Sequence, residues 1–482
     1  MTTRFSGFFR QTLVLLLCQL SVMAAFAQQY TGSWYGTLAT PFQKMVLVYH
    51  ITADASGNLS ATMDSPDQKA FGIKMDTAYV ANDSLHINFK RAGITYAAAL
   101  VNDTALHGRF FQGAALPLNM THDKLEAAAP RARPQTPKPP YSYNVVDTTY
   151  YNADKSIRFG ATLTYPKENK RYPVLLMITG SGQQDRDEEL FDHRPFAIIA
   201  DYLTKQGYAV LRVDDRGAGK STGQFKDATS ADFAKDVQAG IAFLKTLPVV
   251  DPKKIILAGH SEGGCIAAMI AAESKEVAYV ISLAGVGVSG RDLIVQQGVD
   301  MRRAAGNTSA SDLILIETAL RSMANTVVAE PDPAKGLAKI TADSKAFEKT
   351  IPDTTLTRLY QNTDSATRAK NLEASVNRFY DPWFRFLITR NFPDYWKKIT
   401  VPILAINGDK DVQVAAEPNL TAIRKAAESN GNKRVTTVSL PGLNHLFQHC
   451  KTCTTQEYAQ LEESLAPELL EQLRVWLAAN VK

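Results

Sequence analysis

A short serine motif between two glycines constrains this sequence more than any other feature. Residues 259–263 read G-H-S-E-G, an apolar β-strand pattern precedes them at 255–258, and an alanine-rich helical pattern follows at 264–272. A serine between a strand and a helix needs a turn so tight that side chains two positions away on either side would clash. The motif therefore predicts that Ser261 is lifted off the end of a buried strand, at the positive end of a helix.

From about residue 143, strand and helix patterns alternate. The clearest helix covers 230–247, with Ser230 as the expected N-cap. This alternation predicts a doubly wound, mainly parallel sheet. Residues 290–398 show helical patterns without a buried strand, and we expect them to form a helical lid insertion at the carboxyl ends of the strands. The expected buried strands cover 173–178, 208–213, 255–258, 277–283, 403–406 and 435–440.

The N-terminal part of the chain has a different organisation. Residues 1–27 have a basic start, an apolar run and a small-x-small end, which predicts a secretory signal and export to the periplasm or the medium. Residues 28–123 carry short alternating runs separated by turn residues, which predicts a small all-β sandwich or barrel. Residues 124–142 contain five prolines and read as an extended linker. The region of alternating strands and helices is therefore expected at 143–482.

Charge and hydropathy exclude some classes of partner. The formal net charge is +5 and becomes +3 without Arg4 and Arg10 of the leader, which is too little to indicate nucleic acid binding. After the leader, no apolar run reaches the length of a membrane span. We therefore expect a small-molecule ester or a peptide-like substrate. Binding of cell envelope or glycan by the all-β domain stays open.

Ser261 needs a base that removes its proton and an acid that orients the base. His445 lies in a turn-rich loop after the strand at 435–440 and is the expected base, whereas His449 lies deeper in the next segment. The strand at 403–406 runs into Asp409 and Asp411. We prefer Asp411, because a short turn separates it from the strand. The order serine, aspartate, histidine is the one found in α/β-hydrolase triads.

A tetrahedral intermediate also needs donors for its oxyanion. The backbone N–H of Glu262, next to the nucleophile, is one expected donor. The second should come from the glycine-containing loop at 179–184, from the amide of Ser181, Gly182 or Gln183, among which the sequence does not choose. This chemistry needs neither a cofactor nor a metal.

Four segments together resemble bacterial α/β-hydrolase esterases near the serine-aminopeptidase-like branch. They are 180–187 (GSGQQDRD), 214–221 (DDRGAGKS), 259–264 (GHSEGG), and the segments that carry Asp411 and His445. The resemblance covers about 145–482 and implies acyl transfer through an acyl-serine. Its motifs are specific for the fold and the triad and not for the substrate. Taking the resemblance together with the leader at 1–27, we interpret the chain as an exported carboxylesterase. A serine peptidase or aminopeptidase is the alternative, with Glu317, Glu348 and Asp381 as the acids that could hold a substrate ammonium.

Several charged and sulfur-containing residues near the motifs allow more than one interpretation. Arg186 either contacts substrate or braces its loop through ion pairs, and the second interpretation is the commoner one for charged loops. Cys450 and Cys453 could form a disulfide, remain thiols or hold zinc, and an exported chain favours the disulfide. A third class of function is an envelope-binding or glycan-binding protein with an inert hydrolase domain.

Overall fold

The computed structural model of the protein describes residues 28–40, 44–54, 56–68, 70–89, 93–112, 115–125, 133–359 and 365–481. The predicted signal at 1–27 lies outside the described residues. The chain divides into two compact units, Met1–Pro130 and Arg131–Lys482, which are described separately.

The first unit is all-β. Its strands form one sheet with the order β4-β3-β2-β1-β10-β8-β7-β6-β5, and β9 pairs with β8. The sheet curls toward closure, because only Met75 and Asp76 separate its two edge strands in the chain, and their backbone N–H groups donate to Ala61 O of β3 and to Asn88 O of β6. Trp34, Tyr49 and Tyr96 fill the interior. The strands are β1 Gly32–Ala39, β2 Lys44–Ala53, β3 Leu59–Ser65, β4 Ala70–Lys74, β5 Thr77–Ala81, β6 Ser84–Phe89, β7 Ile94–Asn102, β8 Ala105–Phe111, β9 Ala115–Pro117 and β10 Met120–Thr121.

The second unit has an eight-stranded sheet with the order β11-β12-β14-β13-β15-β16-β17-β18. The pairs β11–β12 and β12–β14 are antiparallel, and all later neighbours are parallel. Most of the near-continuous apolar runs read from the sequence become strands that are buried on both faces. The run at 435–440 differs, because it forms an edge strand that is buried only at its two ends. The strands are β11 Asn144–Tyr151, β12 Arg158–Tyr165, β13 Tyr172–Ile178, β14 Ala209–Val213, β15 Val250–His260, β16 Tyr279–Leu283, β17 Ile403–Gly408 and β18 Val435–Leu440.

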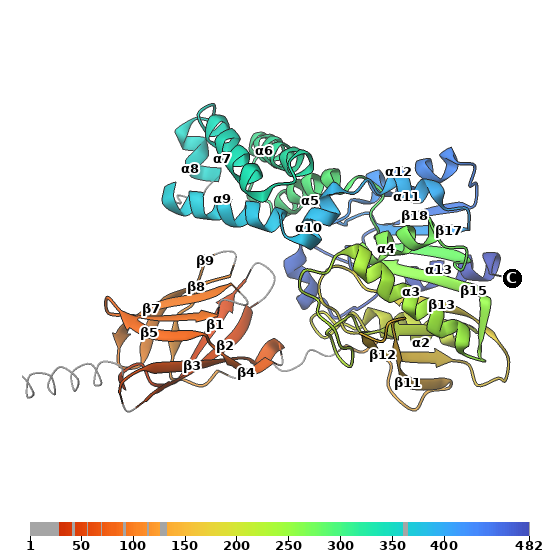
Figure 1. Cartoon of the computed structure of the whole chain (residues 1–482), viewed down its shortest axis with the longest axis horizontal. Coiled ribbons are helices and arrows are strands. Elements are labelled where there is room, and N and C mark those ends of the chain that lie inside the picture. Colours follow the sequence, from red (N-terminus) through yellow and green to blue (C-terminus); the bar gives the residue numbers. More distant parts are fainter. Residues whose placement is uncertain are drawn as a thin grey trace, which may run out of the picture. The chain divides into compact units, whose positions relative to one another are not determined.

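Helices cover both faces of this sheet (Figure 1). One core cluster joins α2 (Pro195–Lys205) and α13 (Pro467–Asn480) to the sheet, and the other joins α3 (Ser230–Thr246), α4 (Glu262–Ala271) and α12 (Ala416–Ser429). The N-cap of α3 is Thr229, whose backbone N–H donates to Asp232, so the expected cap at Ser230 is wrong by one residue. The Ser230 hydroxyl is instead directed to Glu262.

A helical insertion separates β16 from β17 (Figure 1). It fills the region where the sequence shows helical patterns without a buried strand. Its last helix packs into the core beside α4 and α12, with Trp396 fully buried. The helices are α5 Gly290–Ala304, α6 Ala310–Ala329, α7 Pro333–Glu348, α8 Asp353–Leu359, α9 Ser365–Phe379, α10 Pro382–Thr389 and α11 Pro393–Lys398.

The structure differs from the predicted linker at its C-terminal end. Arg133 is 8% exposed and donates to the backbone carbonyls of Phe191, Ala459 and Leu461. Gln135 donates to Leu465 O and accepts from Ser464 N. Proline-rich composition predicts an extended chain, but two polar side chains with buried backbone partners dock this segment on the second unit.

Candidate active site

The sharp turn at Ser261 is present between β15 and α4. Ser261 has φ 53° and ψ −117°, a conformation that side chains rarely adopt. The flanking glycines are needed for close approach. A Cβ on Gly259 would lie 2.0 Å from Gly263 O, and one on Gly263 would lie 2.2 Å from Ile178 O. This tight turn places Ser261 at the carboxyl end of β15, as the motif predicted.

The structure brings the three predicted catalytic residues together. His445 Nε2 lies 3.1 Å from Ser261 Oγ, and His445 Nδ1 lies 2.7 Å from Asp411 Oδ2. Asp411 is buried, and its Oδ1 accepts hydrogen bonds from the backbone N–H groups of Gln413 and Val414. The carboxylate is therefore held in place by its own turn, with the other oxygen directed at the imidazole.

Asp409 and His449, the alternatives to Asp411 and His445, form other contacts. Asp409 Oδ1 accepts from Gly442 N at 2.7 Å, so Asp409 braces the turn before the histidine loop. His449 Nδ1 pairs with Glu463 at 3.0 Å, on a half-exposed surface. Of these two aspartates and two histidines, the structure places Asp411 and His445 within hydrogen-bond distance of each other, and His445 within that distance of Ser261.

A second layer of buried polar groups supports the histidine loop. His260 Nε2 lies 3.0 Å from His445 O, and His260 Nδ1 lies 3.0 Å from Glu188 Oε1. Burial opposes a charge on His260, but the Glu188 carboxylate outweighs it and raises the pKa of the imidazole above its usual value. Sequence reasoning missed this layer, because Glu188 and His260 are far apart in the chain.

Glu188 also organises the loop predicted to hold the oxyanion. It accepts the amide of Gly180 at 2.6 Å, and Asp215 accepts the amide of Gln184 at 2.8 Å. Within the described ranges, no acceptor is recorded for the amides between these two positions. These are the amides of the predicted donors Ser181, Gly182 and Gln183. The amide of Glu262, the other predicted donor, likewise has no acceptor within the described ranges.

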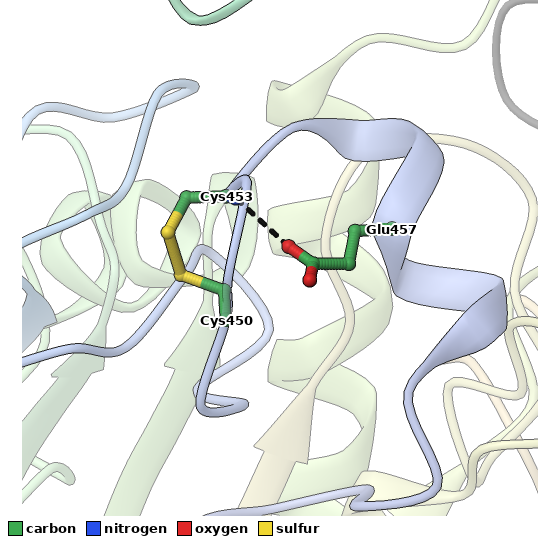
Figure 2. Close-up of side chains that lie close together, drawn as sticks. All are labelled: Cys450, Cys453 and Glu457. Carbon is green, nitrogen blue, oxygen red and sulfur yellow. Dashed lines mark hydrogen bonds between the residues drawn. A yellow bond between two sulfur atoms is a disulfide. The ribbon is translucent and has the colours of Figure 1, made fainter.

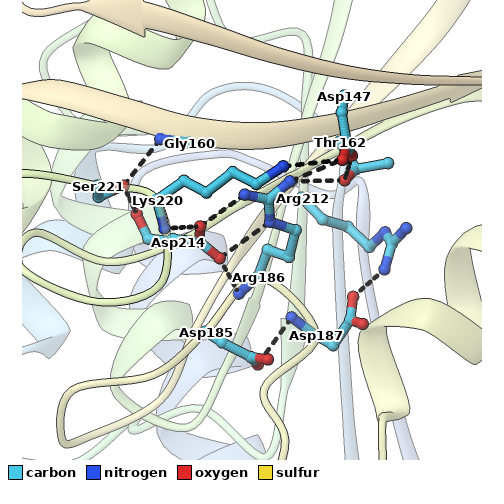
Figure 3. Close-up of polar contacts among 10 residues, drawn as sticks. All are labelled: Asp147, Gly160, Thr162, Asp185, Arg186, Asp187, Arg212, Asp214, Lys220 and Ser221. Atoms are coloured by element: carbon cyan, nitrogen blue, oxygen red, sulfur yellow. Dashed lines mark hydrogen bonds and ion pairs between the residues drawn. The ribbon is translucent and has the colours of Figure 1, made fainter.

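Arg186 is a structural brace. Its guanidinium binds Asp214 through two bonds, at 2.9 and 2.6 Å, and also reaches Asp147 and Thr162 (Figure 3). Its side chain is 12% exposed, and that of Asp214 is 3% exposed. The network ties the oxyanion loop to the strands beneath it, which agrees with the interpretation as a loop brace.

A pocket opens beside the oxyanion loop, between β13, β14 and α3. Its lining includes Gly180, Gly182, Asp215, Phe233 and Val237. Burial raises the pKa of Asp215 to about 7, and the nearby carboxyls of Glu188 and Glu262 act in the same direction, against the donors from Thr179 and Gln184. The Asp215 carboxyl, which lines this pocket, is therefore expected to change its charge near neutral pH.

Cys450 and Cys453 form a disulfide. With Glu457 they are the one group of closely spaced candidate metal ligands found in the part of the chain that the structure describes (Figure 2). The sulfurs are bonded to each other, and the Glu457 carboxylate accepts the amides of Lys451, Thr452 and Cys453. The residues therefore do not fit a zinc site in this state.

The sequence was compared with known families. A model of the X-Pro dipeptidyl-peptidase (S15) family matches residues 155–442. The chain belongs to the S15 family. The match includes Ser261 and Asp411 and ends just before His445. Membership and fold confirm the predicted resemblance to the α/β-hydrolase superfamily, in its esterase- and peptidase-like part.

Individual relatives of this S15 protein are distant. Esterase EstD of Thermotoga maritima is 22% identical over 292 residues, 59% of this chain and 57% of the relative. Thiohydrolase apmlB of Arthrinium phaeospermum is 38% identical over 78 residues, 16% of this chain and 25% of the relative. The matches thus span about half or less of these relatives' own length. The solved structure of the Pyrococcus furiosus esterase Pf2001 superimposes with TM-score 0.41 and 16% identity, covering 71% of this chain and 94% of that one.

No helix in the described ranges is long and apolar enough to cross a membrane.

Proposed function

We propose that this protein is an exported serine hydrolase that cleaves carboxylic esters through an acyl-serine intermediate. The observation that carries the proposal is the hydrogen-bonded line from Asp411 through His445 to Ser261, with the serine on a strained turn. Such a line is the arrangement that activates a hydroxyl for attack on a carbonyl.

In the proposed reaction, Ser261 Oγ attacks the ester carbonyl while His445 Nε2 takes the hydroxyl proton. The negative charge that develops on the carbonyl oxygen is stabilised by the Glu262 amide and by one amide from 181–183. His445 then gives its proton to the departing alcohol, which leaves the acyl group on Ser261. Water, deprotonated by His445, attacks the acyl carbon and releases the acid, and the proton returns to Ser261.

The helical insertion is proposed to act as a lid over this site. Trp383 of α10 donates its indole N–H to Glu262, the residue after the nucleophile, at 2.9 Å. Cleavage of peptide substrates is a second candidate function, favoured by S15 membership. Two of the three acids considered for a substrate ammonium are engaged, because Glu317 pairs with Arg321 and Asp381 caps α10.

Export is part of the proposal and rests on the leader pattern at 1–27 and on the Cys450–Cys453 disulfide, which an oxidising compartment would maintain. The all-β unit is proposed to bind envelope or glycan and so to bring the hydrolase to large substrates.

Activity-based labelling tests the proposal. An organophosphonate should label the wild-type protein and the exposed control Ser429→Ala, but not Ser261→Ala, which should also lose essentially all turnover of short acyl esters. Turnover of acyl esters should exceed that of aminoacyl amides. If Ser261→Ala kept its labelling or its turnover, the assignment of the nucleophile would be wrong.

A further inference from the structure

Glu262 is a buried acid next to the proposed nucleophile, and one of its two carboxylate oxygens is not paired with a donor. The residue is 3% exposed, and its backbone N–H is the proposed oxyanion donor. Oε1 accepts from Ser230 Oγ at 2.6 Å and from Trp383 Nε1 at 2.9 Å. Oε2 is equally buried and makes no hydrogen bond of normal geometry among the described residues. The Ser181 side chain of the oxyanion loop also acts on this carboxyl and opposes the rise of its pKa that burial causes, so the carboxyl lies beside that loop.

A buried carboxylate oxygen without a donor is costly, so its retention needs a reason. A purely structural role would be fulfilled by Oε1, which already joins α3, α4 and α10. An amide or a smaller polar side chain could accept those two hydrogen bonds without leaving a second buried oxygen unpaired. The arrangement at Oε2 therefore indicates that a group from outside the chain completes it.

The surroundings of the carboxyl locate that group on the acyl side of the substrate. The leaving alcohol must take its proton from His445, and so it lies beside the histidine. The Glu262 carboxyl is held instead between α3 and the Trp383 indole of the insertion. Its charge also raises the pKa of Asp215, a residue that lines the pocket next to the oxyanion loop.

We propose that Glu262 is a specificity-determining residue whose Oε2 accepts a hydrogen bond from a hydroxyl or amine on the acyl group, close to the reacting carbonyl. This inference rests on the acyl-transfer function proposed above and adds the class of acyl group. An acyl group with only hydrogen or methyl at that position would leave Oε2 unpaired, as it is in the free protein, so its kcat/KM should be about 10- to 100-fold below that of an acyl group that carries the donor.

The test uses three matched substrates, the 4-nitrophenyl esters of propionate, 2-hydroxypropionate and 2-aminopropionate, assayed at pH 8 with correction for spontaneous hydrolysis. The pH is chosen because burial raises the pKa of Glu262 and the acceptor must be charged. In the wild type, at least one donor-bearing ester should exceed the propionate ester about 10- to 100-fold in kcat/KM. The two donor esters distinguish a hydroxyl from an amine.

Glu262→Gln probes the same oxygen. Ser230 and Trp383 both donate, so they hold the amide oxygen at the position of Oε1 and place the amide NH₂ where Oε2 was. The acceptor at this position becomes a donor. The ratio of kcat/KM for a donor-bearing ester to kcat/KM for the propionate ester should therefore fall to about one or below. Glu273→Gln makes the same change at an exposed position just after α4 and should keep the wild-type ratio.

A wild-type ratio near one, or a preference unchanged in Glu262→Gln, would overturn the inference. The wild-type ratio does not depend on the folding of any variant. Hydrolysis of the propionate ester, with its loss in Ser261→Ala, reports on the proposed function separately. The inference can therefore fail while the serine hydrolase assignment stands.

Discussion

Arg133 should be essential for the stability of the unit Arg131–Lys482, although it lies in a segment whose composition predicts a linker. Its guanidinium donates to Phe191 O at 2.8 Å, to Ala459 O at 3.1 Å, and to Leu461 O. Arg133→Ala leaves these carbonyls without their charged donor in a buried place.

The size of the effect follows from those contacts. A hydrogen bond to a charged group contributes about 1.5–3 kcal/mol, and the contributions are not additive because water reaches part of the vacated space. We expect a loss of about 3 kcal/mol in the free energy of unfolding. A unit of this length has an unfolding entropy of about 0.7 kcal/mol/K, so its Tm should fall by about 4 °C.

Thermal unfolding of Arg133→Ala beside Lys138→Ala checks this expectation, because Lys138 is an exposed basic residue of the same segment. A chain that begins at residue 143 should show at least the same loss relative to one that begins at 131. Equal Tm values for Arg133→Ala and Lys138→Ala would refute the docking of this segment.

Three further outcomes are expected. Asp411→Asn should lower kcat about 10⁴-fold, while Asp409→Asn, which loses only the bond to Gly442 N, should cost far less; the reverse order would exchange their roles. Replacing Cys450 and Cys453 with serine should cost about 2 kcal/mol of unfolding free energy, because the closed loop is short, and should abolish the effect of reductant on Tm. In the folded protein the pKa of Asp215 is about 7, above its ordinary value of 3.8. The protonated carboxyl therefore stabilises the fold, and this contribution is complete below about pH 4 and is lost as the pH rises through about 7. The Tm difference between wild type and Asp215→Asn should change across this window, and a constant difference would contradict it.

The sequence was informative where local chemistry determines local structure. The G-x-S-x-G pattern predicted both the strained turn and its place between β15 and α4, because only glycine avoids clashes of 2.0–2.2 Å there. The loops that carry Asp411 and His445 could be located because each follows a strand. Parallel strands bring their carboxyl ends to one edge of the sheet, so residues far apart in the chain meet.

Contacts that depend on tertiary packing alone were not predictable. His260 occupies a variable position of the serine motif, and nothing in the sequence pairs it with Glu188. Ser230 was read as a helix cap from its residue type, but Thr229 takes that role and frees the Ser230 hydroxyl for Glu262. The docking of Arg133 was not predicted, because the prolines around it indicated an extended linker. Each case is a buried polar group whose partner is distant in sequence.

These distant contacts explain how a base on an irregular loop can be held accurately. Asn444 Oδ1 accepts the amides of Leu446 and Gln448, which fixes the turn on the far side of His445. The Gln448 side chain reaches His193 and Glu463 O, and His193 in turn lies 2.7 Å from Ser464 Oγ. The segment around Ser464 is the one that Gln135 and Arg133 hold in place. Support for His445, the proposed base, therefore extends to the start of the second unit, where the sequence predicted only a linker.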